Sequence, residues 1–196
     1  MAINDVPIRM PISANDRVAV RVLLSGGIIA CPTEGVWGLS CRATDKIAIK
    51  RLLELKKRSS EKGLIILVSS LQQVKEWIGP IPCYAREHLH SEGHRPITWL
   101  LPSTSKCPPI LNGGRHSVAI RIVNLFNLIH FCKKVGPIVS TSANHSGRQP
   151  LFLRHQVVAR FGKTIDWICA GRTGGLKGPT RIEDPINRRI IRPGYS

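Results

Sequence analysis

The sequence has no hydrophobic run long enough to cross a membrane. Its longest uninterrupted apolar stretch is Leu64–Val68, whereas a spanning helix needs about 20 apolar residues. Residues 1–11 also lack the basic start and apolar run of a secretory signal peptide. These absences argue against an integral membrane protein and a secreted one. We therefore expect a soluble, cytoplasmic protein with no membrane partner.

Acidic residues are scarce. The 196 residues include 12 Asp and Glu against 29 Lys and Arg, which gives a net charge of +17 at pH 7. No acidic residue stands between Gly93 and Ile165, and the basic residues there are Arg95, Lys106, Arg115, Arg121, Lys133, Lys134, Arg148, Arg154, Arg160 and Lys163. A field of this sign favours nucleotides, phosphates or nucleic acid. The alternative interpretation is a solubility trait of one lineage.

Paired cysteine motifs are also absent. The 6 cysteines form no C-x-x-C pair, and several lie in apolar runs, so we expect small buried thiols. His88, His90 and His94 follow an H-x-H-x-x-x-H spacing, but no fixed scaffold is evident around them. The sequence therefore predicts no metal site built from protein side chains.

Repeats, low-complexity tracts and long linkers are missing as well, which favours a single domain over residues 1–196. Helices are predicted after the capping residues Ser13, Thr44 and Asn124, from Leu71 to Ile78, and around Val157. Strands are predicted at residues 27–31, 64–68, 97–101, 118–122, 138–140, 165–169 and 189–192. This alternation, with several strands lacking a period of two, predicts an α/β sheet covered by helices on both faces.

Two polar segments follow predicted regular elements. Residues 32–38 come directly after a strand, where ligand sites of α/β sheets gather, and Thr33 offers a hydroxyl there. An ordinary turn is the alternative. Lys56, Arg58 and Lys62 stand at the end of a predicted helix. They suit a phosphate chain, although the helix dipole also favours cations at this place.

Two later segments carry polar groups beside predicted strands. Arg121 lies within the apolar strand 118–122, where burial is costly without an anionic partner. Because no acidic residue is close in sequence, an external carboxylate or phosphate is one interpretation, and a solvent-facing arginine is the other. Residues 140–147 are dense in hydroxyls and amides but lack the G-x-S-x-G of serine hydrolases.

A glycine-rich segment, residues 171–180, includes Lys177. Its spacing does not match the G-x-x-x-x-G-K-[ST] pattern, so it is not a Walker A loop. We therefore set its glycine-rich pattern aside as a phosphate-binding signal.

Taken in order, the polar segments resemble the threonylcarbamoyl-AMP synthase family, the YrdC-like proteins. The resemblance covers nearly the whole chain and includes the family's K-x-R and S-x-N signatures at Lys56/Arg58 and Ser142/Asn144. The matching segments are residues 32–34, 52–58, 118–121, 139–147 and 191–194. The resemblance implies a twisted mixed α/β sheet with helices on both faces and a basic concave site.

The resemblance also implies a reaction. L-Threonine, bicarbonate or CO₂, and ATP with Mg²⁺ give L-threonylcarbamoyladenylate and pyrophosphate. A separate threonylcarbamoyl transferase complex then uses the adenylate to build t⁶A at position 37 of tRNA, and direct tRNA binding is possible. By similarity, the catalytic residues are Lys56, Arg58, Ser142 and Asn144. The ATP contacts are Lys56, Arg58, Lys62, Ser117, Asn144 and Arg192, and the threonine contacts are Thr33, Arg121, Ser142 and Thr180.

The chain departs from the family pattern at three places. Ser59 follows Arg58 where proline is common, and Phe152 stands where many members have a small hydroxyl residue near the nucleotide. The residues Gly93-His94-Arg95-Pro96 replace a usual proline-glycine-proline.

Two other functions stay open at this point. One is a non-catalytic protein that binds tRNA or double-stranded RNA through its basic face, with an affinity that falls steeply with salt. The other is a carbamoyl-adenylate enzyme that uses another carbamoyl donor. The length of the chain disfavours the second, because that chemistry usually belongs to much longer chains.

Overall fold

Strands and helices alternate along most of the chain in the computed structural model, which describes residues 13–91 and 96–194. The strands in these residues are β1 (Ile29–Pro32), β2 (Trp37–Arg42), β3 (Ile65–Val68), β4 (Ile97–Pro102), β5 (Ser117–Ile122), β6 (Ile138–Ser142), β7 (Trp167–Ile168), β8 (Arg181–Asp184) and β9 (Arg189–Arg192). The helices are α1 (Ala14–Leu24), α2 (Lys46–Lys56), α3 (Cys83–Ser91), α4 (Pro109–Asn112), α5 (Phe126–Val135) and α6 (Arg154–Phe161), with 3₁₀ turns η1 (Ser60–Lys62) and η2 (Leu71–Val74).

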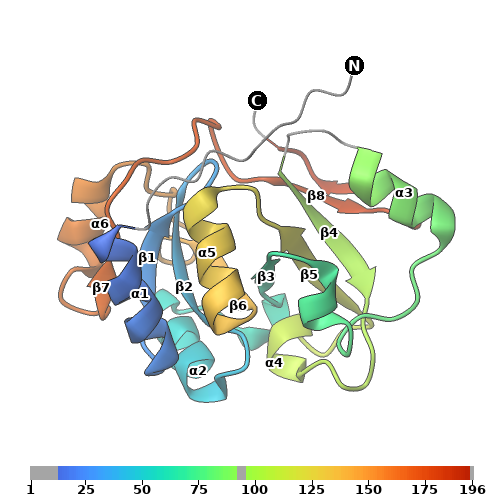
Figure 1. Cartoon of the computed structure of the whole chain (residues 1–196), viewed down its shortest axis with the longest axis horizontal. Coiled ribbons are helices and arrows are strands. Elements are labelled where there is room, and N and C mark those ends of the chain that lie inside the picture. Colours follow the sequence, from blue (N-terminus) through green and yellow to red (C-terminus); the bar gives the residue numbers. More distant parts are fainter. Residues whose placement is uncertain (1–12, 92–95, 195–196) are drawn as a thin grey trace.

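These strands form one mixed sheet in the order β7-β1-β2-β6-β3-β5-β4-β8-β9. The pairs β1/β7, β3/β5 and β4/β8 are parallel, and the other neighbours are antiparallel. The strands fan out across the molecule in Figure 1, as expected from the natural twist of β-sheets.

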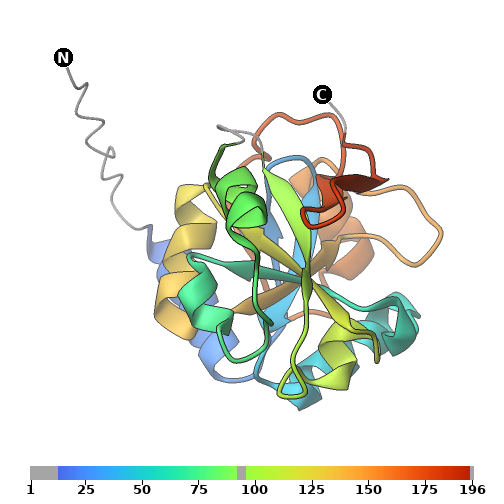
Figure 2. The ribbon, with the colours of Figure 1, turned by 90° about the vertical axis from the view of Figure 1, so that its right-hand side faces the viewer.

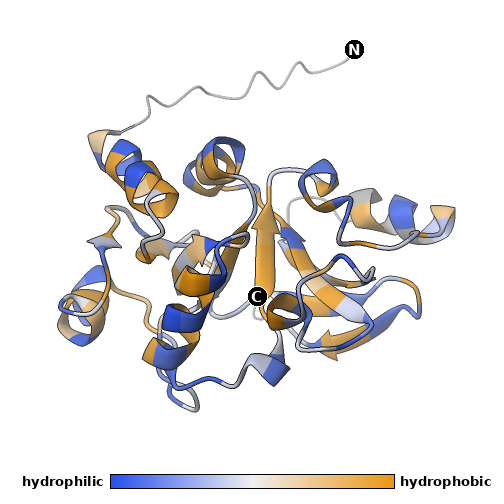
Figure 3. Cartoon of the chain, turned by 90° about the horizontal axis from the view of Figure 1, so that it is seen from below, coloured by the Kyte–Doolittle hydropathy of each residue, from blue (hydrophilic) through white to orange (hydrophobic). Residues whose placement is uncertain are grey.

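Helices cover both faces of the sheet, as predicted. On one face, Leu23 of α1 and Phe131 of α5 pack with Leu67 of β3. On the other face, Leu52 of α2 and Phe161 of α6 belong to the larger apolar core. Figure 2 shows α1 and α5 on one side of the strands and α6 on the other. Figure 3 shows that the helices mix hydrophobic and hydrophilic residues. Their buried residues are mostly apolar, and burial of these side chains is the main source of stability.

The sheet face under α1 and α5 changes character along its strands. Ile138 at the start of β6 belongs to the apolar core beneath these helices. Further along the same face, Ser140 lies opposite Ser40, and Ser142 lies opposite Gly38. Partners in a ladder project to the same side of a sheet. Small polar side chains therefore replace apolar ones there and leave room for a ligand.

The chain crosses the whole sheet after α6. Strand β7 pairs with β1 at one edge, whereas β8 pairs with β4 near the opposite edge. Figure 1 shows the connecting segment, coloured orange to red, passing along the top of the view. This crossing segment, residues 169–180, is therefore held by sheet pairing at both ends.

The predicted helix starts are correct to within a residue. Ser13 caps α1, as predicted. Asp45 caps α2 in place of Thr44, because its carboxylate accepts two main-chain N–H bonds from the first turn. Helix α5 begins after Leu125, so Asn124 is not its cap.

Several elements differ from the sequence expectation. The helix predicted from Leu71 to Ile78 is a single 3₁₀ turn, η2. Strand β2 was not predicted, and its first two residues, Trp37 and Gly38, fall in the segment expected as a loop. Helix α3 was not predicted. The polar strand β8 was not predicted either, and it exists because β4 and β9 pair with it on both sides.

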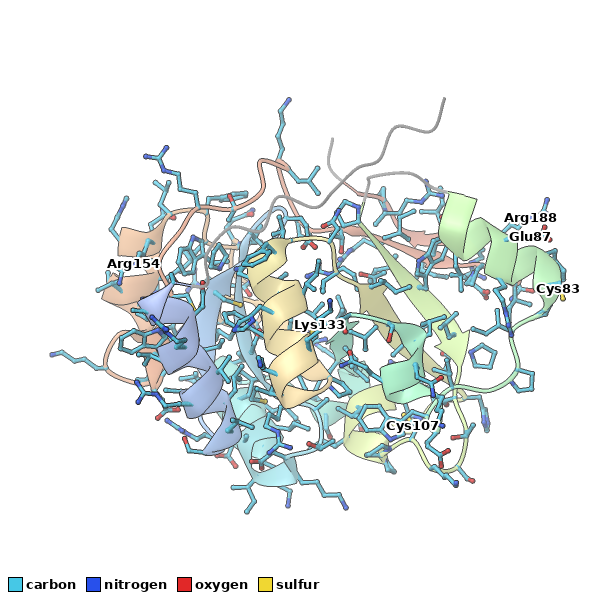
Figure 4. All side chains as sticks on the ribbon, in the orientation of Figure 1. Cys83, Glu87, Cys107, Lys133, Arg154 and Arg188 are labelled. Carbon is cyan, nitrogen blue, oxygen red and sulfur yellow. The ribbon has the colours of Figure 1, made fainter. Side chains whose placement is uncertain are left out.

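The cysteines are buried except for Cys83, so the prediction of buried thiols is wrong for that residue. Figure 4 labels Cys83 at the beginning of α3. Burial raises the pKa of the Cys31 thiol to about 12, which keeps it protonated and unreactive. In the part of the chain that the structure describes, no helix is both long enough and apolar enough to cross a membrane.

Candidate active site

A small cavity lies over the polar part of the sheet. Its volume is about 60 Å³, enough for a pair of water molecules. It brings together five of the predicted site residues: Thr33, Arg121, Ser142, Thr180 and Arg192. The remaining lining residues are Gly35, Val36, Gly38, Ile65, Ser140, Thr141, Gly178 and Pro179.

Arg121 is buried, with 5% of its surface exposed. One terminal nitrogen, Nη2, lies 3.2 Å from the Oε2 atom of Glu34, and the other donates to the Thr180 hydroxyl at 3.3 Å. The Thr180 hydroxyl is also 3.0 Å from the hydroxyl of Thr98. The sequence suggested no acidic partner for Arg121 within the chain. The structure corrects this expectation, because Glu34 pairs with Arg121. That glutamate is distant in sequence and close in the fold.

Arg192 and Thr33 complete this end of the cavity through contacts to main-chain oxygens. Arg192 donates to the Thr180 carbonyl from Nε at 3.2 Å and from Nη2 at 2.6 Å. The Thr33 hydroxyl donates to the Val36 carbonyl at 2.7 Å. These bonds fix the turn before β2 and the end of the crossing segment.

Lys56 joins the two signature pairs into one cluster. The side chain is buried, and its Nζ atom donates to the main-chain carbonyls of Ser142 and Asn144, the latter at 2.5 Å. A third bond reaches Asn144 Oδ1 at 3.1 Å. The Ser142 hydroxyl donates to the same Oδ1 atom at 2.7 Å. The last residue of α2 therefore anchors the loop that follows β6.

Burial lowers the pKa of Lys56 to about 7, and the nearby Arg58 cation acts in the same direction. The three oxygen acceptors around Nζ favour the charged form and oppose this effect. An anionic ligand at this place would also favour the ammonium form. Binding of a phosphate near Lys56 can therefore shift this side chain from its neutral to its protonated form.

Five predicted site residues do not line the cavity. Lys56 and Asn144 contact its lining residue Ser142, whereas Arg58, Lys62 and Ser117 lie farther along. Arg58 is half-buried and donates to the Gly63 carbonyl at 3.0 Å, while Lys62 is exposed. Ser117 is the first residue of β5, two positions before Ala119, which pairs with the cavity residue Ile65. All three lie near the same end of β3 and β5.

The departure at Ser59 has a structural role. Its hydroxyl accepts the amide N–H of Glu61 at 3.2 Å and caps the 3₁₀ turn η1. Phe152 is 40% exposed and lines a separate open hollow of about 880 Å³ together with Trp37, Arg154 and Val158. The positions Gly93, His94 and Arg95 lie outside the described residues.

The glycine-rich crossing segment belongs to the site, although its glycines do not form a Walker A loop and only Thr180 in it was predicted as a site residue. Gly174 N–H donates to the Thr33 carbonyl at 2.9 Å, and Leu176 N–H donates to the Glu34 carbonyl at 3.0 Å. A Cβ atom on Gly35 would lie 1.9 Å from the Gly178 carbonyl oxygen. Glycine is needed where two main chains approach so closely. The density of glycine was the signal that could have revealed this contact.

A larger cavity, about 850 Å³, lies elsewhere and contains none of the predicted site residues. Trp99 and Ile122 line it, whereas their neighbours Thr98 and Arg121 point to the opposite face of β4 and β5. Lys75 and Arg86 stand at this cavity. Ser142 lines the smaller cavity, and Lys56 and Asn144 are hydrogen-bonded to Ser142, so we place the candidate site there.

No cluster of three or more His, Cys, Asp or Glu residues forms a metal site within residues 13–91 and 96–194. Of the histidine motif, His94 lies outside the described residues, and the side chains of His88 and His90 are not described. The polar side chains that line the cavity are hydroxyls and two arginines, a set that suits an anionic ligand better than a bare divalent metal.

A protein-family model described as telomere recombination, Sua5/YciO/YrdC, matches residues 21–194. The chain belongs to the Sua5/YciO/YrdC family. Curated relatives named threonylcarbamoyl-AMP synthase include one from Nitrosococcus oceani, 40% identical over 169 residues, which are 86% of this chain and 91% of the relative. Another, from Cellvibrio japonicus, is 36% identical over 184 residues, 92% of this chain and 97% of the relative.

Solved structures agree with the fold. Sua5 of P. abyssi complexed with L-threonine has a TM-score of 0.80 and 29% identity, covering 91% of this chain and 54% of that chain. The chain therefore spans about half the length of that Sua5 protein. The E. coli YciO structure has a TM-score of 0.76 at 20% identity, covering 92% of this chain and 88% of that chain. These likenesses confirm the predicted twisted mixed α/β sheet.

Proposed function

We propose that this chain is a threonylcarbamoyl-AMP synthase, which forms L-threonylcarbamoyladenylate and pyrophosphate from L-threonine, bicarbonate or CO₂, and ATP. The observation that carries the proposal is the cavity where the buried Arg121 and five hydroxyl-bearing residues meet beside the Lys56–Asn144 cluster. Relatives that carry this enzyme's name match about nine-tenths of the chain. This function accounts for the hydroxyl-rich segment Ser140–Asn144 at the end of β6, for which RNA binding alone offers no reason.

Threonine would bind in the small cavity. Arg121 supplies the cation for its carboxylate, and Thr33, Ser142 and Thr180 supply hydroxyls for its polar groups. The cavity must widen to admit the amino acid, since its present volume is about 60 Å³. The Sua5 protein of P. abyssi, complexed with L-threonine, supports this assignment.

ATP would bind beside the threonine, with its phosphates near Lys56, Arg58 and Lys62. Arginine and lysine suit phosphate oxygens because they combine charge with several N–H donors. Ser117, Asn144 and Arg192 would complete the nucleotide contacts. Lys56, Arg58 and Lys62 carry positive charge, opposite to that of the triphosphate.

The reaction needs positioning and charge stabilisation. The uncharged amine of threonine adds to CO₂, which gives a carbamate and releases one proton. A carbamate oxygen then attacks the α-phosphorus, and the bond to the pyrophosphate leaving group breaks. No covalent enzyme intermediate is required. Lys56, Arg58, Ser142 and Asn144 would hold the phosphates and offset the charge that develops in the transition state.

Magnesium would enter with ATP. The donor set of the cavity fits an ion bound mainly by phosphates and water, with the oxygens of Ser142 and Asn144 as the nearest protein candidates. When bound, Mg²⁺ offsets phosphate charge. The side chains named above still bind and orient the nucleotide.

The product would pass to a separate threonylcarbamoyl transferase complex that forms t⁶A at position 37 of tRNA. We place this reaction in the cytoplasm, where ATP and tRNA are available. The absence of a membrane-spanning helix within the described residues is compatible with that location.

The test is pyrophosphate release with ATP, Mg²⁺ and bicarbonate, measured with and without L-threonine. We expect release that depends on threonine, together with an adenylate of the corresponding mass. Release without threonine dependence, or none from a folded protein that still binds tRNA, would overturn the proposal and favour the RNA-binding function.

A further inference from the structure

Glu34 is a buried acid beside the cavity, and it has no role in the function proposed above. Its side chain is 4% exposed, and its Oε2 atom is 3.2 Å from Nη2 of Arg121. Thr33 and Gly35, its sequence neighbours, line the cavity, but Glu34 does not. The carboxylate therefore lies behind Arg121, out of reach of a ligand in the cavity.

Burying a carboxylate and a guanidinium is costly, and an apolar pair of similar volume is often at least as stable. Apart from the 3.2 Å ion pair with Arg121, neither oxygen of Glu34 has a hydrogen-bond partner among the described residues. Arg121 Nε likewise has none among them. An ion pair with so few supporting bonds is poorly explained by stability alone.

The surroundings of the pair point to the orientation of the guanidinium. Glu34 holds one terminal nitrogen of Arg121, and Thr180 holds the other. The main chain of Glu34 also accepts the Leu176 N–H at 3.0 Å, from the crossing segment that ends at Thr180. Both partners of Arg121 thus belong to segments that hydrogen-bond to each other.

We propose that Glu34 is the positioning residue for Arg121, holding its guanidinium at the cavity so that it meets the carboxylate of the amino-acid substrate. This inference rests on the proposed function. Arginine recognises a carboxylate best through two parallel N–H bonds, which require a fixed guanidinium plane. A carboxylate behind the guanidinium fixes that plane and keeps the empty cavity from holding an uncompensated charge.

The test compares Glu34→Gln with the wild type in the pyrophosphate-release assay. Glutamine keeps the shape and removes the charge. We expect the KM for threonine to rise about 10-fold, a loss typical of one charged hydrogen bond, with the KM for ATP unchanged. Glu34→Asp keeps the charge on a shorter side chain, and its KM for threonine should lie between those of the wild type and Glu34→Gln. A folded Glu34→Gln protein with the wild-type KM for threonine would overturn the proposal.

A double-mutant cycle with Arg121→Gln separates positioning from general structure. If Glu34 acts through Arg121, then Glu34→Gln changes the KM for threonine much less in the Arg121→Gln background. Equal effects in both backgrounds would overturn the proposal. The double variant leaves no unpaired charge at this pair. It can therefore be compared with Arg121→Gln even if Glu34→Gln alone fails to fold.

Glu183 provides a matched control. It is equally buried, with 3% side-chain exposure, pairs with Arg181, and does not line the cavity. Glu183→Gln should lower stability and leave the KM for threonine unchanged. A similar rise in KM in this variant would overturn the proposal. If the wild-type protein shows no threonine-dependent release of pyrophosphate, the proposed function itself is wrong. If the wild type is active but the variants do not show the expected KM changes, only the role of Glu34 is wrong.

Discussion

Lys56 donates hydrogen bonds to two oxygens of Asn144, the main-chain carbonyl at 2.5 Å and the side-chain Oδ1 at 3.1 Å. A residue at the end of a helix and a residue in a loop, far apart in sequence, thus form one unit. An ammonium group has three donors, and the third reaches the Ser142 carbonyl. The ammonium group of Lys56, from the K-x-R signature, therefore binds both residues of the S-x-N signature.

Replacing Lys56 by alanine should abolish most activity. The change removes a cation for the phosphates and releases the loop that holds Ser142 and Asn144. We expect the rate of threonine-dependent pyrophosphate release to fall about 100-fold or more, as for loss of one donor to a charged transition state. A folded Lys56→Ala protein with wild-type activity, judged by circular dichroism and the same assay, would remove Lys56 from the site.

Binding of ATP should take up a proton above neutral pH. The pKa of Lys56 is lowered to about 7, and bound phosphates raise it because they favour the ammonium form. Uptake is therefore absent well below pH 7, where Lys56 is already protonated, and approaches about one proton near pH 8. Calorimetry with Mg-saturated ATP, in buffers of different ionisation enthalpy, measures it. Equal uptake by Lys56→Met would contradict this origin.

Exposed cations outside the site should matter little to catalysis. Lys133 lies on α5 and Arg154 on α6, and both, with Lys163, are exposed. Figure 4 labels the first two, well separated on the molecule. We expect the triple alanine variant to keep activity within about 2-fold, because exposed charges are screened by salt. Loss of activity comparable with that of Lys56→Ala would instead favour binding through a diffuse basic surface.

Thr180→Val should weaken threonine binding. The change keeps the shape but removes the hydroxyl that accepts from Arg121 at 3.3 Å and contacts Thr98 at 3.0 Å. A lost bond to a charged group costs about 1.5–3 kcal/mol, so the KM for threonine should rise about 10- to 100-fold. Isothermal titration with threonine gives an independent value, and unchanged affinity would exclude Thr180 from the binding contacts.

Gly35→Ala should displace the crossing segment. The new Cβ would lie 1.9 Å from the Gly178 carbonyl oxygen, an overlap that forces the two main chains apart. We expect a stability loss of about 1–3 kcal/mol and a higher KM for threonine. Gly79→Ala is a suitable control, because its nearest contact is a Pro102 side-chain atom at 3.3 Å. Equal behaviour of the two variants in melting and activity assays would contradict the close approach.

Local patterns in the sequence predict most of the elements. Ser13 as a cap and the apolar run at residues 64–68 depend on neighbouring residues alone, and both are confirmed. The pairing of Glu34 with Arg121 was missed, because it depends on the sheet order, which no local pattern contains. Strand β8 was missed for the same reason, since its polar residues become a strand through pairing with β4.

Within the site, the resemblance located residues that the fold brings together, including Thr33, Arg121, Ser142 and Thr180. It did not reveal how they are supported. The contacts of the crossing segment with Thr33 and Glu34 join main-chain atoms, and such contacts leave little trace in sequence beyond a need for glycine.

The crossing segment also limits how the site can open. A hinged lid swings about one fixed end, but this segment is fixed at both, through β7 at one sheet edge and β8 near the other. Its glycine-rich middle is also bonded to Thr33 and Glu34, so the segment moves outward only if these main-chain bonds break or an edge strand unzips. The two-residue strand β7 is the weaker of these anchorages. Exchange of substrate and product should therefore require a transient opening of these bonds or fraying of β7.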